Sequence, residues 1–515
     1  MNDPVLAWND IALEVQRRDF TVGSLGDSSA LGDLQPEHGG PTRTSRALAM
    51  VHIATYEAVA LTDPGAALQR YAALSGVSVP PPPAGLAIPP GNAQDLATFV
   101  AGAVGGAACT VLRRLWTKQI AFIDAESAKM KQGLQGQYAD YGWRIGVSVA
   151  TEMLNVRQST AADGYYVDRS NLPEDTHFAL AHGKHKPDPF SSGQGRLGTH
   201  WGSVTPFCIA PAPAGMSIHD GRISDHPPLA TPRYDDAVLD VKALGSSANS
   251  TRVVDETVAG LFWGYDGPRG LGVPPRLYNQ VVRAFAQAAG GATTAEYVRL
   301  LALVNAGMAD AAIVAWSAKY HYDLWRPVVG IREHDAGFGA GNGSHAVNLP
   351  NPGAALSLQA DPLWAPLGRP GTNTLGDFTK TPDFPAYPSG HATFGAVAFR
   401  LAAHFFAEKL ARSIADVMNN VRFDFVSDEF NGTNKDPKGD IRVRHVRNFS
   451  LREAIVENAL SRVYLGVHWR FDGLGAVAPD KLEGPIPDDP AVAQKLSDPI
   501  EKKMGGVPVG LVVAA

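Results

Sequence analysis

The sequence has few cysteines, and this limits the kinds of protein it can be. Only two occur among 515 residues, Cys109 and Cys208. Two cysteines cannot form the disulfide framework of a small secreted domain. One disulfide bridge is possible if the two sulfur atoms lie close together in the fold, but we expect two buried thiols.

The N-terminus lacks the pattern of a conventional signal peptide, because acidic and basic residues interrupt it from Asp3 onward. The longest uncharged apolar stretch, residues 96–112, is short and rich in Ala and Gly. Such a stretch favours a buried helix over a membrane span. We therefore expect a soluble protein with no membrane partner, either cytoplasmic or exported by a non-classical route.

The sequence also lacks a large excess of either sign of charge. Its 45 basic and 51 acidic residues give a net charge of -6. This balance gives no reason to expect nucleic acid as a partner. The apolar content of 45% suits a globular protein. A chain of this length exceeds one ordinary core, so we expect two packed units.

Strand-type alternation is rare, whereas apolar residues recur at spacings of three and four in several segments. These segments predict an all-α protein. Residues 168–250 are dense in Pro, Gly, Asp and His and predict one long loop region around the helices. The segments predicted as helices are 46–59, 138–154, 275–289 and 294–320.

Three short segments in the C-terminal half carry candidate functional residues: KYHYDLWRP (319–327), PSGH (388–391) and SRVYLGVH (461–468). Lys319 and Arg326 could face one side if the helix persisted over the two turns between them. With Arg462 they would surround one tetrahedral oxyanion. For Lys319 and Arg326 taken alone, the alternative is two surface cations at a frayed helix end. The presence of the other two segments makes this alternative less favoured.

Ser389 and Gly390 stand at the start of a predicted helix, where unpaired backbone amides suit an oxyanion. A plain N-cap is the alternative role for Ser389. His391 follows them directly and, paired with His468, is the candidate acid/base group.

The three motifs, Lys-x6-Arg-Pro, Pro-Ser-Gly-His and Ser-Arg-x5-His, resemble those of the vanadium-dependent haloperoxidases, which share a superfamily with type 2 acid phosphatases. The similarity extends through residues 315–333, 384–395 and 461–473, and more weakly through 8–19 and 262–267. The resemblance implies two stacked helical bundles with long irregular loops and an oxyanion site in the C-terminal bundle. We place the boundary between residues 1–290 and 291–515.

The same resemblance implies vanadate as the cofactor and gives each site residue a role. His468 would ligate the vanadium, and His391 and Lys319 would be catalytic. Asp472, four residues after His468, could orient its imidazole, although an exposed carboxylate is equally plausible. Asp266 could pair with Arg462. The residues expected to hold the vanadate oxygens are Lys319, Arg326, Ser389, Gly390 and Arg462.

The implied reaction is oxidation of bromide or chloride by hydrogen peroxide to a hypohalous species that halogenates an organic acceptor. Trp316 and Phe384 match positions where chloride-oxidising members carry aromatics, and an apolar wall there would desolvate the halide. Plain core packing is equally plausible for both rings.

The sequence is also compatible with three other functions. A phosphatase with His468 as nucleophile, a non-halogenating biosynthetic relative and a phosphate-binding scaffold would all use the same residues. The oligomeric state, including a homo-oligomer, is undecided. A zinc site is disfavoured at the loosely spaced histidines His177, His182 and His185.

Overall fold

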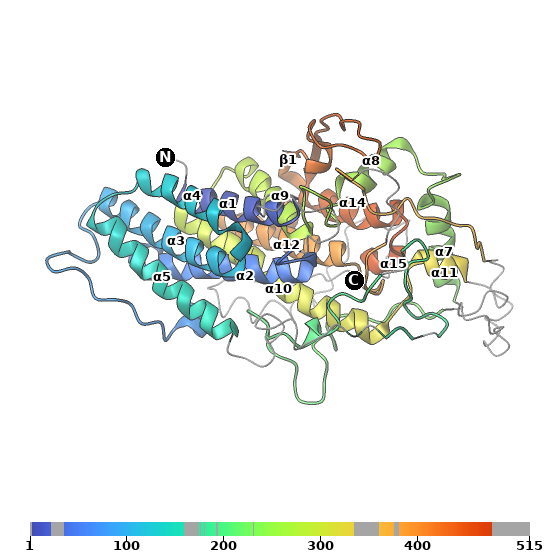
Figure 1. Ribbon diagram of the computed structural model, residues 1–515, viewed down its shortest axis with the longest axis horizontal. Helices are drawn as coiled ribbons and strands as arrows, with labels where there is room; N and C mark the ends of the chain where they lie inside the picture. Colours follow the sequence, from blue (N-terminus) through green and yellow to red (C-terminus); the bar gives the residue numbers. More distant parts are fainter. Residues whose placement is uncertain are drawn as a thin grey trace.

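The structure is a computed structural model that describes residues 3–21, 36–158, 175, 177–179, 181–191, 194–229, 231–333, 360–374 and 381–475. Five long helices form the N-terminal bundle, at the left of Figure 1. α3 packs closely against α5, and α2 lies against both. These helices are α1 (Pro4–Asp19), α2 (Gly40–Thr62), α3 (Ala93–Leu115), α4 (Ile120–Gln132) and α5 (Gln137–Gln158). Single 3-10 turns accompany them at Pro64–Ala66, Ala72–Leu74 and Thr117–Gln119.

The C-terminal bundle forms around α12, which packs against α9, α10 and α14. A two-stranded antiparallel sheet and short helices flank it. The elements are α7 (Pro232–Leu244), α8 (Val254–Phe262), α9 (Pro274–Ala288), α10 (Thr294–Tyr322), α11 (Pro327–Arg332), α12 (Gly390–Leu410), α13 (Ile414–Asn420), β1 (Arg422–Phe425), β2 (Arg447–Ser450), α14 (Leu451–Tyr464) and α15 (Arg470–Leu474), with 3-10 turns at Trp201–Ser203 and Asp428–Phe430.

The predicted all-α class is confirmed, and the helices expected from periodicity are present with slightly different ends. The prediction of one long loop over residues 168–250 is wrong in part, because α7 lies within it. Thr231 caps α7 through the amide of Tyr234, and a proline occupies its first turn, both of which are helix-start signals. The boundary near residue 290 stays a prediction, since α8 and α9, which precede it, pack on α14 and α12.

α10 joins the two bundles. Its start is fixed by a capping box in which Thr293 and Glu296 each bind the other's backbone amide. One side of the helix packs on α2 and another on α12. A single cluster of buried apolar side chains accordingly extends from α1 to the C-terminal helices. The two bundles therefore share one core.

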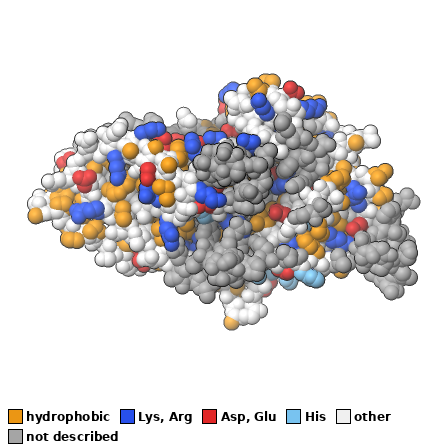
Figure 2. Space-filling model, viewed as in Figure 1, with side chains coloured by type: hydrophobic (Ala, Val, Ile, Leu, Met, Phe, Trp, Pro, Cys, Tyr) orange, Lys and Arg blue, Asp and Glu red, His pale blue; other side chains and the backbone are white. Residues whose placement is uncertain are grey.

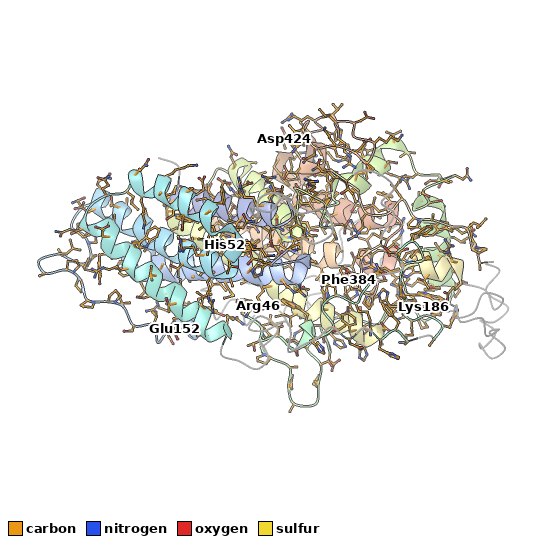
Figure 3. All side chains as sticks on the ribbon, in the orientation of Figure 1. Arg46, His52, Glu152, Lys186, Phe384 and Asp424 are labelled. Carbon is orange, nitrogen blue, oxygen red and sulfur yellow. The ribbon has the colours of Figure 1, made fainter. Side chains whose placement is uncertain are left out.

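A buried polar chain also crosses between the bundles. Asn279 of α9 donates to Asn305 of α10 at 2.9 Å, and Asn9 of α1 contacts Asn279 at 3.4 Å and His52 of α2 at 3.1 Å. Figure 3 labels His52 on α2. Burial, helped by the charge of Arg283, lowers the pKa of His52 to about 3, so the ring stays neutral. Buried polar groups are stabilised only when they are paired in this way.

α3 and α10 are long and apolar enough to cross a membrane by length and composition alone. The apolar windows of these helices are 67% and 94% buried within the protein. Helices in a protein core show the same property, so their hydropathy is accounted for by packing. Figure 2 shows basic and acidic side chains interspersed over the N-terminal bundle on the face in view.

Four glycines allow α3 and α5 to approach each other at backbone distance. A Cβ atom at any of them would lie 2.1 to 2.3 Å from a carbonyl oxygen of the opposite helix. No side chain fits at such a distance, so the helix crossing requires glycine. The four residues are Gly102 and Gly106 on α3 and Gly142 and Gly146 on α5.

Replacing Gly146 by alanine should therefore destabilise the N-terminal bundle. The new methyl group would meet the Ala103 carbonyl oxygen, and forcing atoms into a packed contact costs about 1–3 kcal/mol. Thermal unfolding followed by circular dichroism measures the effect. The matched control is Gly133→Ala at the end of α4, where the nearest atom to the added Cβ is 3.9 Å away. Equal melting temperatures for the two variants would contradict the packing argument.

Candidate active site

Lys319 lies in the last turn of α10 and is fully buried. Its ammonium group donates to the backbone carbonyl oxygens of Pro385 and Ala386, at 2.8 and 3.0 Å, and to that of Pro388. These bonds engage all three hydrogens of an ammonium group. Lys319 therefore fixes the loop that leads into Ser389 and acts on the rest of the site through its charge.

Arg326 reaches the same place by a turn and not along a continued helix. α10 ends at Tyr322, Asp323 adopts a left-handed conformation with φ +52°, and Arg326 caps α11. The two cations still meet over one ring, because the Lys319 Nζ atom and the Arg326 Cζ atom lie 5.0 and 5.1 Å from the centroid of Phe384. Convergence thus results from the turn after α10.

His468 is held with one ring nitrogen toward these cations. Arg326 Nη1 lies 2.9 Å from His468 Nε2, and His468 Nδ1 lies 2.8 Å from Asp472 Oδ2. A guanidinium can only donate, so Nε2 carries the lone pair and Nδ1 carries the proton that Asp472 accepts. A neutral imidazole with an oriented lone pair is the form that ligates a metal centre.

Asp472 contacts His468, but the two residues do not lie on successive turns of the same helix. His468 precedes α15, whose N-cap is Trp469, and Asp472 is the third residue of that helix. Its Oδ2 also accepts from the Trp469 amide at 3.0 Å. Burial raises the pKa of Asp472 to about 7, against the opposing effect of Lys319 and Arg326. Of the two alternatives for Asp472, the exposed carboxylate is therefore wrong, because the start of α15 places this side chain in the protein interior.

Arg462, near the end of α14, pairs with Asp266 in the loop between α8 and α9. Its Nη2 atom lies 2.9 and 2.8 Å from the two carboxylate oxygens. Burial would raise the pKa of Asp266, but Arg462, His391 and Arg369 together hold it below its usual value. Asp266 thus remains ionised beside Arg462, where the resemblance places it.

The start of α12 brings backbone amides and His391 to the same pocket. Ser389 is the N-cap and accepts from the Ala392 amide at 3.4 Å. Gly390 and His391 occupy the first positions, whose amides have no partner within a helix. The His391 carbonyl is fixed by the Tyr278 hydroxyl and the Asn458 amide at 2.9 and 2.8 Å.

The His391 ring has a defined tautomer. Its Nε2 atom lies 2.6 Å from the carbonyl oxygen of Gly264, which can only accept, so Nε2 carries the proton. Nδ1 is then a lone-pair nitrogen, and it has no hydrogen-bond partner among the described residues. Burial, with the charge of Arg462, lowers the pKa of His391 to about 3, although Asp266 and Gly264 act in the opposite direction. His391 is therefore a neutral base at ordinary pH.

Aromatic rings form one wall of the pocket. Trp316 and Phe384 pack with ring centroids 4.8 Å apart, and Phe394 lies 6.2 Å from Trp316. Figure 3 labels Phe384 between the two bundles. These rings line a cavity of about 580 Å³ together with Gly390, His391, Asp266 and His468. The predicted apolar wall and the predicted histidines therefore border the same space.

The charge distribution favours a bound anion. Burial lowers the pKa of His468 well below its usual value, and Arg326, Lys319, Arg462 and His391 all lower it further, which places these four groups around it. Burial and the neighbouring Arg462 also lower the pKa of Arg326 to about 9, with Asp472 opposing. Several buried cations close together are unfavourable unless negative charge compensates them.

The guanidinium groups also have nitrogens that the protein leaves without a partner. Arg326 Nη2 and Arg462 Nε and Nη1 are buried and make no hydrogen bond with the described residues. Such groups normally find an acceptor, because leaving a buried charged donor unpaired costs at least about 1–3 kcal/mol. The residues present therefore fit a tetrahedral oxyanion with His468 Nε2 beside it.

Sequence reasoning missed several contributors to this site. Gly264, which holds His391, gave no signal, and neither did the carbonyl groups that bind Lys319. Phe394 could have been found, since it lies three residues after His391 on the same helix. Tyr278 and Asn458 belong to distant helices, and only the folded structure shows that they fix the start of α12.

The structure also describes the two cysteines and two of the loosely spaced histidines, His182 and His185. Cys109 and Cys208 are both buried, and they do not form a disulfide with each other. His182 packs edge-on against Trp325 with centroids 4.6 Å apart, and His185 packs on Phe178 at 5.6 Å. No group of three or more His, Cys, Asp or Glu side chains in the described part of the chain is placed to hold a metal ion.

Comparison with known proteins identifies the family of this chain. A family model for the second helical-bundle domain of vanadium chloroperoxidase matches residues 299–478. The chain is 32% identical to the vanadium chloroperoxidase of Curvularia inaequalis over 92% of its own length and 79% of that protein.

Solved structures show the same fold. A bacterial vanadium-dependent iodoperoxidase matches with a TM-score of 0.57 at 19% identity, over 92% of this chain and 93% of that one. The holo form of a bacterial vanadium-dependent chloroperoxidase matches with a TM-score of 0.52 at 14% identity, over 88% and 91% of the two chains. On the extent and identity of the match to the Curvularia enzyme, the chain belongs to the vanadium-dependent haloperoxidase family.

Proposed function

We propose that the protein binds orthovanadate and uses hydrogen peroxide to oxidise bromide, and less readily chloride, to a hypohalous species that halogenates organic acceptors. The observation that carries the proposal is the set of unpartnered guanidinium nitrogens on Arg326 and Arg462 beside the lone pair of His468. Family membership supports a haloperoxidase-type enzyme.

The residues that would hold vanadate divide into a ligand and a cradle. His468 Nε2 would ligate the vanadium, and Asp472 keeps the proton on the other ring nitrogen. Arg326, Arg462, Ser389 and the Gly390 amide would bind the oxygens, with Lys319 adding charge. When bound, vanadate supplies a Lewis-acid centre that activates peroxide for attack by halide without changing oxidation state.

His391 would act as the proton acceptor. Activation of peroxide requires a group that accepts its protons. His391 lines the cavity, and its Nδ1 atom carries a lone pair because Nε2 holds the ring proton. Gly264 prevents the ring from turning, because its carbonyl holds Nε2–H. Each proton taken up makes an imidazolium next to Asp266, whose Oδ1 is 3.9 Å from Nε2 and stabilises the charge.

Trp316 and Phe384 would face the halide. A halide loses water when it enters beside these rings, and this raises its reactivity in a low-dielectric space. Bromide is easier to dehydrate and oxidise than chloride, which supports the proposed order.

One assay tests the proposal against the phosphatase alternative. Apoprotein is loaded with orthovanadate and given peroxide, bromide or chloride and a halogen acceptor, while a parallel sample without vanadate receives an aryl phosphate. Halogenation that requires vanadate is the expected result. Phosphate-ester hydrolysis with no peroxide-dependent halogenation would reassign the protein to the phosphatases.

Two histidine variants should separate binding from turnover. His468→Ala removes the ligand, so calorimetric titration with orthovanadate should show a large loss of affinity. His391→Ala should keep that affinity and lose about 10²–10⁴-fold in halogenation kcat, the usual contribution of a positioned acid or base. His177→Ala, at an exposed loop position, is the control. Equal effects of the two active-site variants on affinity would contradict the division of roles.

Anion affinity should depend on the protonation of Lys319. Burial, with the charge of Arg326, lowers the pKa of Lys319 well below its usual value. A bound anion stabilises the ammonium form and raises that pKa, so binding should take up protons, and affinity should fall as pH rises through the depressed pKa.

Calorimetric titration with orthovanadate in buffers of different ionisation enthalpy measures this proton uptake. Lys319→Met should take up fewer protons than the wild type at the same pH. Protonation of vanadate itself is common to both proteins and cancels in the difference. Equal proton uptake would show that Lys319 does not titrate with binding.

A further inference from the structure

The loop between α8 and α9 positions two residues of the active site. Its Gly264 carbonyl binds His391, and its Asp266 carboxylate binds Arg462. Between them, Tyr265 adopts a left-handed conformation with φ +47°. A residue with a side chain keeps such a conformation only where its surroundings hold it. The contacts that hold Tyr265 therefore help to decide where the His391 ring and the Arg462 guanidinium lie.

Glu429, in the short turn after β1, holds Tyr265 without lining the active-site cavity. Its Oε1 atom accepts from the Tyr265 amide at 3.0 Å. The preceding residue, Asp428, donates its own amide to the Tyr265 hydroxyl at 2.9 Å. A Cβ atom added to Gly264 would lie 2.7 Å from Glu429 Oε1, so the carboxylate packs directly on the glycine whose carbonyl binds His391. One turn thus fixes Tyr265 through both its backbone and its side chain.

The Glu429 carboxylate is itself fixed from its other side. The side chain is fully buried. Its Oε2 atom accepts from Arg442 Nη1 at 2.7 Å and from the Thr372 hydroxyl. Thr372 Oγ1 in turn accepts from Arg442 at 2.5 Å. Hydrogen bonds to an ionised group are about twice as strong as neutral ones, so ionised Glu429 is a firm anchor for the Tyr265 amide.

The charge on Glu429 changes near neutral pH. Burial raises its pKa to about 7, with the charge of Asp266 adding to the rise. Arg442, the Thr372 hydroxyl and the Tyr265 amide act in the opposite direction. The carboxylate is therefore ionised above this pKa and protonated below it. Protonation removes the charge that strengthens its bonds to Arg442 and to the Tyr265 amide.

We propose that Glu429 is a positioning residue of the active site, which holds the loop between α8 and α9 in the conformation that orients His391 and Arg462. Glu429 touches neither substrate nor oxyanion and acts through the Tyr265 amide. In its ionised form it should favour turnover through His391 and anion affinity through Arg462. The effect on turnover rests on the proposed haloperoxidase function, whereas a phosphatase would share the effect on anion affinity.

Glu57 in the N-terminal bundle provides a matched control, because its carboxylate has the same kind of partners. It is fully buried on α2, accepts from the Tyr71 amide at 2.9 Å and pairs with Arg70. Replacing either glutamate by glutamine keeps an oxygen for the tyrosine amide and removes the charge. Both Glu57→Gln and Glu429→Gln should therefore lower the melting temperature. This shared loss measures the purely structural contribution of a buried glutamate.

Only Glu429→Gln should change catalysis, and only above the pKa of the glutamate. Halogenation kcat with bromide and peroxide, at saturating orthovanadate, is measured at about pH 6 and about pH 8, on either side of that pKa. At the higher pH, Glu429→Gln should lose about tenfold against the wild type, as expected for one charged hydrogen bond. At the lower pH the wild-type glutamate is itself protonated, so the two proteins should be nearly equal. Titration of other groups is common to both and cancels in the ratio.

Calorimetric titration with orthovanadate tests Glu429 without turnover. The affinity of Glu429→Gln should fall below that of the wild type at the higher pH and equal it at the lower pH. Glu57→Gln should match the wild type at both. Because Glu429 reaches the anion through Asp266 and Arg462, the loss of affinity reports on the loop and not on a lost ligand.

Arg442→Gln is a second variant, in which Glu429 itself is intact. Arg442 is partly exposed, so its replacement is expected to leave the fold in place. Arg442 lowers the pKa of Glu429, and its removal should raise that pKa. At the higher pH, Arg442→Gln should therefore lose kcat as Glu429→Gln does, because its glutamate binds a proton there.

The outcomes separate the inference from the proposed function. Equal kcat and equal orthovanadate affinity in Glu57→Gln and Glu429→Gln at both pH values would overturn the inference and leave the haloperoxidase function intact. A loss in Glu429→Gln that is the same at both pH values would reduce Glu429 to a packing residue and overturn it too. Absence of halogenation by the wild type would overturn the proposed function, while the orthovanadate affinities would still decide the inference.

Discussion

Mutual repulsion among three buried cations is the constraint around which the C-terminal bundle is arranged. Lys319, Arg326 and Arg462 are at most 1% exposed, and like charges in a low-dielectric interior destabilise one another strongly. The fold offsets each in a different way. Lys319 is surrounded by three carbonyl oxygens, Arg326 by the carbonyls of Phe384 and Val467, and Arg462 by a carboxylate. Three guanidinium nitrogens, on Arg326 and Arg462, remain buried without a partner among the described residues.

The loop between α8 and α9 shows how much of this arrangement comes from irregular structure. It supplies both the Gly264 carbonyl that fixes His391 and the Asp266 carboxylate that holds Arg462. A base and a cation from two different helices are thus positioned by residues only two apart in the chain. Because the loop is anchored on both, their relative position is set by one short segment.

The sequence was sufficient to predict the helices, the three motifs and the residues that converge, because helical periodicity and motif spacing are local properties. It was not sufficient to predict how they converge. Arg326 arrives by a left-handed turn at Asp323, and Asp472 arrives through the start of α15. Both depend on where a helix ends, which propensity specifies poorly. The carbonyl groups that bind Lys319 have no sequence signature, since every residue has a carbonyl.

The position of α10 between α2 and α12 has a consequence for the protein as a thermodynamic system. Cutting the chain ahead of α10 would remove α2 and expose the side of α10 that α2 covers. It would also remove Asn279, the hydrogen-bond partner of the Asn305 side chain. The segment bearing the three motifs is therefore not expected to be a self-sufficient folding unit. An anion bound in the C-terminal bundle should therefore also stabilise the N-terminal bundle against unfolding. Both bundles should then unfold in a single cooperative transition.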